Sequence, residues 1–133
     1  MTRFVVDASV VLHLLHEKLS VAPAHSLLAP SLIRSQLLSL LHEAVARGEL
    51  DPHDAMAQLA RFSDLSIRLL GDSALRRRAW IVADELGWSS TYDAEYIALT
   101  QLQGDAFVTL ENELAGRVAG VVELASVDDL LRP

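Results

Sequence analysis

Three acidic residues lie at positions from which they could bind a cation together. Asp7 and Glu111 each end an apolar run that predicts a buried strand, and Asp93 lies in the first turn of a predicted helix. In an open parallel sheet, ligands bind beyond the carboxyl ends of the strands. Carboxylates that meet there repel each other unless a cation neutralises them. Because the ligands are oxygen atoms and the chain has no cysteine, the pattern favours Mg²⁺ or Mn²⁺ over zinc.

Each of these acids also has an ordinary structural interpretation. Asp7 could cap the helix that follows it, and Glu111 could be a solvated turn residue. Asp93 could close a capping box with Ser90. We favour the metal site, because all three acids fall where a parallel sheet places its ligands.

Short apolar runs alternate with helical patterns along the chain, and they predict the elements that position the acids. We expect strands at 3–6, 67–70, 106–110 and 120–124, with a loop over 18–30. Strands separated by helices predict an α/β fold, with a parallel sheet that is covered on both faces. The helices are expected at 8–17, from a cap at Ser31 to about 47, at 52–64, 73–86, 91–103 and 112–118.

The length and composition are those of one globular domain. The chain has 133 residues, of which 51% are apolar and 22% charged, so we expect a single domain over 1–133. No apolar run is long enough to cross a bilayer, and the start of the chain has no signal-peptide pattern. We therefore expect a cytoplasmic protein that makes no contact with a membrane.

The charge balance restricts how the chain could contact nucleic acid. A net charge of −7 argues against a broad basic surface for RNA. Divalent cations at the acidic site would offset part of this charge, so a phosphate substrate is not excluded. Ten of the eleven basic residues are arginine, which suits bidentate contact with phosphate but could equally reflect genomic composition.

Four segments carry a resemblance to a known family: VVDASVVLHLL at 5–15, APSLI at 29–33, TYDAEYIALTQLQGDAFVTLE at 91–111 and VVELASVDDLL at 121–131. Together they resemble the PIN domain, and more closely the VapC-type toxin ribonucleases of bacterial toxin–antitoxin pairs. Their order and spacing extend the resemblance over essentially the whole chain. It implies an α/β/α sandwich with a central parallel sheet of about four or five strands, an acid cluster that binds Mg²⁺ or Mn²⁺, endoribonuclease activity, a homodimer and a VapB-like antitoxin.

Site residues can be matched to this family one by one. Asp7, Asp93 and Glu111 take the positions of the first, third and fourth acids, and the fourth is more often aspartate. Thr109 matches a hydroxyl residue near the site, although β-propensity alone would explain it. The second acid is usually a glutamate six residues after the proline of the APSL segment, and here that position is Gln36. A neutral carbonyl oxygen there should weaken magnesium binding or change the metal preference.

Three further residues are weaker candidates. Glu43 lies on the same helical stripe as Gln36 but about 10.5 Å farther along the axis, and pairing with Arg47 is its alternative role. Glu95 could supply the missing charge from the loosely defined first turn of its helix. Arg34, near the start of the helix that carries Gln36, could contact phosphate or could be a solvated surface residue.

These residues support three functional hypotheses. The first is a bacterial endoribonuclease toxin that cleaves RNA through a cation held by Asp7, Asp93 and Glu111, and that a VapB-like antitoxin inhibits. The second is a PIN-fold protein with weakened catalysis, as Gln36 indicates, which acts by binding RNA or the antitoxin. The third is a phosphatase or receiver-like domain, but such domains need a second aspartate adjacent to the first, and Asp7 has none.

Overall fold

The strands of the protein form one parallel sheet with β1 at its centre. The computed structural model describes residues 1–133 and orders the strands β3-β2-β1-β4-β5, all parallel. The expected α/β class with a parallel sheet is confirmed, and the sheet has five strands. The strands are β1 (Arg3–Val6), β2 (Ser26–Pro30), β3 (Ile67–Leu70), β4 (Ala106–Val108) and β5 (Leu124–Ala125).

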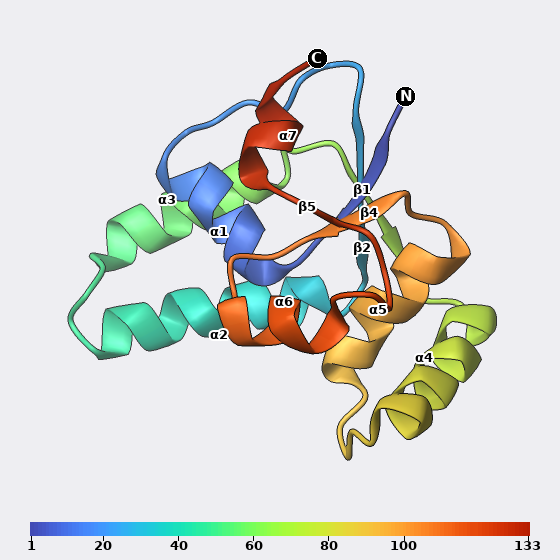
Figure 1. Ribbon diagram of the computed structural model, residues 1–133. Helices are drawn as coiled ribbons and strands as arrows, with labels where there is room; N and C mark the ends of the chain where they lie inside the picture. The colour runs from blue at the N-terminus through green and yellow to red at the C-terminus, as the bar shows by residue number, and fades with distance from the viewer.

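Helices cover both faces of this sheet. Figure 1 shows α1 and α3 on one side of the strands and α4 and α5 on the other, which confirms the three-layer α/β/α arrangement. None of the helices has both the length and the apolar character that crossing a bilayer requires. The helices are α1 (Ala8–His16), α2 (Ile33–Ala46), α3 (Pro52–Phe62), α4 (Ser73–Leu86), α5 (Tyr92–Leu102), α6 (Asn112–Val118) and α7 (Val127–Leu131).

Local signals account for most of these elements. Side chains of β1 and β4 are buried on both faces of the sheet, as continuous apolar runs predict for parallel strands. Asp51 caps α3, with Pro52 at the first helical position, and Asp72 caps α4. Gly87 ends α4 in the left-handed conformation with a φ of 71°, where a side chain would be strained. These boundaries confirm the sequence predictions.

One prediction about the sheet is wrong. The segment 18–30 was expected to be a loop because of Pro23 and Pro30, but its last five residues form β2, which pairs with β1 and β3. Pro30 is the final residue of β2, so its missing N–H falls at the end of the strand. Leu28 and Ala29 are buried in the core, and this burial outweighs the turn signals.

The C-terminal part differs from expectation as well. β4 ends at Val108 rather than at 110, and β5 is two residues long and lies at 124–125 rather than at 120–124. A final helix, α7, was not expected, although Ser126 and Asp129 form the capping box that begins it. Ser31 does not cap α2, whose first turn has no side-chain cap.

The order of the strands produces a crevice beside Asp7. From β1 the chain builds β2 and β3 outward on one side of the sheet, and it then returns to build β4 and β5 on the other side. Connections therefore leave β1 and β4 in opposite directions, and the carboxyl ends of such strands border the usual ligand site of an open α/β sheet. Asp7 follows β1 directly, and Thr109 follows β4.

Gly104 marks the closest approach of the end of α5 to β1. A Cβ atom at Gly104 would lie 2.7 Å from Cγ2 of Val5 and 3.1 Å from Cα of Thr100. We expect Gly104→Ala to lower the free energy of unfolding by about 1–3 kcal/mol through overpacking. Gly116→Ala in α6 is the control, because its Cβ would meet no atom within 4 Å and should stabilise the helix by about 0.5–1 kcal/mol.

Chemical denaturation of the two variants and the wild type checks this prediction. A Gly104→Ala protein as stable as the wild type would contradict the close packing of α5 on β1.

Candidate functional site

A hollow of about 530 Å³ lies where β1 and β4 end, and the three acids expected from the sequence line it together. Asp7 comes from the turn after β1, Asp93 from the first turn of α5, and Glu111 from the turn after β4. Gln36 of α2 and Tyr96 of α5 line the same hollow. Residues far apart in the sequence are thus gathered at one edge of the sheet.

The carboxylate of Asp7 is buried and accepts three hydrogen bonds. Its side chain is the N-cap of α1, where Oδ1 accepts from the N–H of Val10 at 3.1 Å. The same oxygen accepts from the hydroxyl of Ser9 at 2.6 Å, and Oδ2 accepts from the hydroxyl of Thr109 at 2.5 Å. A carboxylate has about four acceptor positions, so Oδ2 keeps one for a further ligand. The capping role and the ligand role are therefore compatible.

The two hydroxyl groups connect Asp7 to the turn after β4. Ser9 and Thr109 each donate their only hydroxyl proton to Asp7, and each accepts a backbone N–H in turn. The oxygen of Ser9 accepts from Leu110, and that of Thr109 accepts from Glu111, both at 3.0 Å. Thr109 thus has a positioning role beyond β-propensity. Ser9 was not identified from the sequence, although it lies two residues after Asp7 in the first turn of α1.

Asp93 and Glu111 carry pKa values above the ordinary range. Burial raises the pKa of Asp93, the charge of Arg117 lowers it, and that of Asp7 raises it again. Burial raises the pKa of Glu111, and the charges of Asp7 and Asp93 raise it further, while Arg117 opposes them. Glu111 is the N-cap residue of α6, but its side chain accepts no capping hydrogen bond. The capping box with Ser90, the alternative role of Asp93, does not form. The hollow therefore holds an excess of negative charge.

Arg117 of α6 is the basic residue that acts on both of these acids. Its guanidinium lies 3.6 Å from a carboxylate oxygen of Asp93 and stacks over the ring of Trp88, 5.1 Å from the ring centroid. Arg117 was not identified from the sequence. No local spacing relates it to Asp93, since the two residues come from different helices.

The acids share the hollow without forming a compact metal-binding group. No three His, Cys, Asp or Glu side chains of the protein have the mutual spacing of a metal site. Asp93 pairs with Arg117, and two of the three hydrogen bonds of Asp7 come from hydroxyl groups. The donor chemistry nevertheless fits a hard divalent cation, because three carboxylates line one hollow, and burial together with their repulsion raises the pKa of two of them.

Gln36 lies in the hollow, at the position where the family resemblance implies a glutamate. Its Oε1 accepts a hydrogen bond of 2.5 Å from the hydroxyl of Tyr96, which is 1% exposed. Burial, and then the charge of Asp7, raise the pKa of Tyr96 far above its ordinary value, so the hydroxyl remains a donor. Tyr96 was not identified from the sequence, but it lies three residues after Asp93 and therefore on the same face of α5.

The weaker candidates lie at the margin of the hollow or outside it. Glu43 reaches the rim, where it pairs with Arg47 at 4.0 Å as its alternative role predicted. Glu95 does not line the hollow; burial raises its pKa and the charge of Arg76 on α4 lowers it. Arg34 lines a separate, mainly apolar hollow of about 520 Å³, which also includes residues of α3 and β3.

Two solved structures resemble the chain over almost its whole length. PAE2754 from Pyrobaculum aerophilum is 26% identical, with a TM-score of 0.74 over 98% of this chain and 93% of that one. VapBC-1 from nontypeable Haemophilus influenzae is 9% identical, with a TM-score of 0.62 over 95% of this chain and 98% of that one. No protein-family model and no curated protein matches the sequence. The similarity to VapBC-1 establishes the fold, and it confirms the PIN-like α/β/α class expected from the sequence.

Proposed function

We propose that this protein is a metal-dependent endoribonuclease of the VapC toxin type, which hydrolyses RNA phosphodiester bonds in the bacterial cytoplasm. The observation that carries the proposal is the convergence of Asp7, Asp93 and Glu111 in one hollow at the carboxyl ends of β1 and β4. The fold shared with VapBC-1 supports it. A VapB-like antitoxin and a second copy of the chain are the protein partners that belong to this proposal.

Asp7, Asp93 and Glu111 would hold Mg²⁺ or Mn²⁺ through carboxylate oxygens. Asp7 offers the free acceptor position of Oδ2, while its other bonds keep the side chain in one orientation. The chemistry that such a cation supplies is activation of a water molecule and neutralisation of charge on the scissile phosphate. The side chains themselves would hold and orient the cation, so no residue of the chain has to act as a nucleophile.

The rim of the hollow suits a single-stranded substrate. Tyr92 is 64% exposed at the rim, and Leu12 and Leu40 line the hollow beside it. Exposed aromatic rings stack on the unpaired bases of single-stranded RNA, whereas bases in a duplex are already stacked on each other. The combination of an acidic centre and an aromatic rim therefore favours single-stranded RNA over a duplex.

Gln36 supports a second candidate function. It supplies a neutral oxygen, already hydrogen-bonded to Tyr96, where the resemblance implies a fourth carboxylate. A site with three charges binds a divalent cation less tightly than a site with four. The alternative is therefore a PIN-fold protein of weakened catalysis, which acts by binding RNA or the antitoxin.

RNA cleavage is the direct test of the proposed function. We expect the purified protein to cut single-stranded RNA in Mg²⁺ or Mn²⁺ and not in EDTA. Asp7→Asn should reduce the rate by at least about 100-fold, because changes even among residues that only support a metal ligand cost 10- to 100-fold. The control is Asp72→Asn, which alters the aspartate cap of α4 outside the hollow and should leave the rate unchanged. Cleavage that persists in EDTA or in folded Asp7→Asn protein would contradict the proposal.

Gln36→Glu distinguishes the two candidate functions. We expect it to raise Mn²⁺ affinity by about tenfold through the added ligand charge, and to raise the cleavage rate with it. Calorimetric titration and the RNA assay measure the two effects, with Gln101→Glu at the exposed end of α5 as the control for added charge. An inactive wild type with an active Gln36→Glu variant would favour weakened catalysis. Equal behaviour of the two glutamate variants would exclude position 36 from the metal site.

Without metal, the raised pKa of Glu111 should reduce stability at neutral pH. A carboxyl group with a raised pKa in the folded state contributes stability in acid, and this contribution is lost as the pH rises through that pKa. In EDTA at neutral pH we expect the midpoint of thermal unfolding of Glu111→Gln to lie about 1–3 °C above that of the wild type. Interactions between partly exposed charges are typically worth less than about 1 kcal/mol, which corresponds to a shift of this size. The difference should shrink as the pH falls and disappear well below about 4, where glutamate is protonated in both states.

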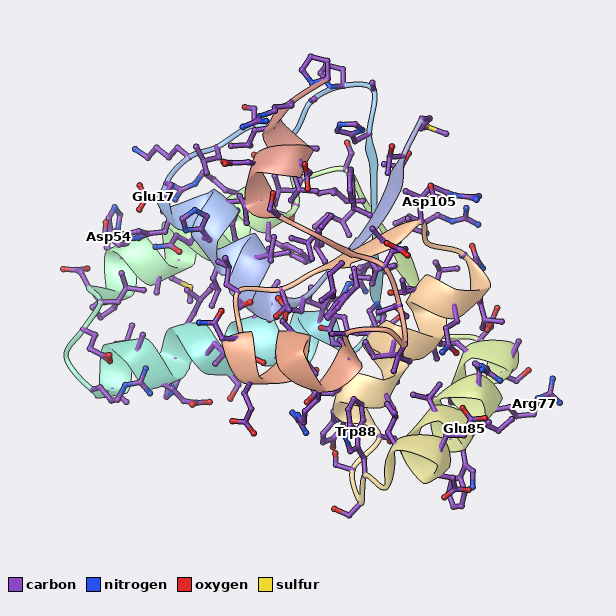
Figure 2. All side chains as sticks on the ribbon, in the orientation of Figure 1. Glu17, Asp54, Arg77, Glu85, Trp88 and Asp105 are labelled. Carbon is purple, nitrogen blue, oxygen red and sulfur yellow. The ribbon has the colours of Figure 1, made fainter.

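Thermal unfolding at several pH values measures this difference. Glu85→Gln is the control, since Figure 2 shows Glu85 on α4, away from α6. In saturating Mn²⁺ the order should reverse, because the wild type then gains stability from the bound cation. A Glu111→Gln protein that is less stable than the wild type in EDTA at neutral pH would contradict the repulsion among the acids.

A further inference from the structure

A second, polar hollow adjoins the acidic one, and Arg117 lies in it. Its volume is about 270 Å³, and its lining includes Trp88, Ser89, Ser90, Asp93 and Arg117. Trp88 belongs to the loop between α4 and α5, where Figure 2 labels it. Asp93 lines both hollows, so the polar hollow begins where the acidic one ends.

Arg117 is held in this hollow by two contacts, and a ligand could replace the first of them. One is the ion pair with Asp93 at 3.6 Å, in which both side chains are more than two-fifths exposed. The other is the stacking of its guanidinium over the ring of Trp88. Exposed ion pairs are weak, typically below about 1 kcal/mol. A ligand that binds Asp93 or Arg117 more strongly can therefore break this ion pair. The ring of Trp88 would keep the guanidinium beside the hollow after Asp93 is released.

The chemistry of the hollow suits a phosphate group. The planar fork of a guanidinium matches two phosphate oxygens, and serine hydroxyls are common additional donors to phosphate. A chain of net charge −7 has no broad basic surface to attract RNA, so its phosphate contacts have to be local. Arg117 is the basic residue whose charge reaches both Asp93 and Glu111.

We propose that this polar hollow is a subsite for a backbone phosphate of single-stranded RNA adjacent to the scissile one, with Arg117 as its ligand. In the metal-free protein Asp93 holds Arg117. Asp93 would hold the cation together with Asp7 and Glu111, and the guanidinium of Arg117 would then be free to bind the phosphate. The inference rests on the proposed function. It adds a binding residue outside the acid cluster and a reason for the pairing of Asp93 with an arginine.

The test compares Arg117→Gln, Arg117→Lys and the wild type in two binding measurements. Mn²⁺ affinity, measured by electron paramagnetic resonance without RNA, should rise about two- to fivefold in Arg117→Gln, the change that corresponds to loss of an exposed ion pair. The affinity for a short single-stranded RNA, measured in Ca²⁺ over a range of salt concentrations, should fall. Its logarithmic salt slope should decrease by about 0.7, the value for one phosphate contact to a single strand. Arg117→Lys keeps the charge, so its Mn²⁺ affinity and salt slope should stay near those of the wild type, whereas its RNA affinity should still fall because the planar fork is lost.

Arg132→Gln is the matched control, because Arg132 pairs with Asp128 on α7, outside both hollows. An Arg117→Gln protein with the Mn²⁺ affinity and salt slope of Arg132→Gln would overturn the subsite. So would a rise in Mn²⁺ affinity with no change in salt slope, since Arg117 would then act on the acids alone. If the wild type binds no Mn²⁺, or binds it equally well after Asp7→Asn, the proposed function itself fails and the inference falls with it.

Discussion

The burial of one carboxylate at the carboxyl end of the central strand is the constraint on which the site depends. Asp7 is 5% exposed, and a buried charge is tolerated only where hydrogen bonds replace water. Those bonds come from the first turn of α1 and from Thr109, which lies 102 residues farther along the chain. The hydrogen bonds that Asp7 accepts therefore join the turn after β1 to the turn after β4. The same turns place Glu111 beside Asp7.

Electrostatic repulsion opposes this arrangement, and the structure balances it in several ways. Three carboxylates share one hollow, and burial with mutual repulsion raises the pKa of Asp93 and Glu111. Arg117 offsets part of the charge from a neighbouring helix, and hydroxyl groups supply hydrogen bonds to Asp7. Such a site has a cost to folding that a bound cation would remove, as is common for groups arranged for function rather than for stability.

The chain also departs from the family pattern where that pattern would add a fourth charge. Gln36 is neutral, and its carbonyl oxygen accepts the hydroxyl of the buried Tyr96. This pair connects α2 to α5 across the hollow without further repulsion. Fewer negative charges at the centre also suit the proposed binding of a polyanionic substrate. The structure thus combines a centre of three carboxylates, rather than four, with one nearby arginine, Arg117.

Local features of the sequence determined much of the fold and the identity of the candidate acids. Capping residues specify α3 and α4, and apolar runs specify β1 and β3, because these signals act between neighbours in the chain. An acid that follows an apolar run indicates a sheet edge, which is why Asp7 and Glu111 could be selected, although Glu111 lies three residues beyond the end of β4. Only the tertiary structure decided that 26–30 becomes a strand, that Arg117 pairs with Asp93, and that Tyr96 bonds Gln36. The burial of β2 between β1 and β3 outweighed the turn signals of the prolines around it. The pairs Arg117–Asp93 and Tyr96–Gln36 each join two different helices. Interactions of this kind depend on packing between distant segments, which no local pattern encodes.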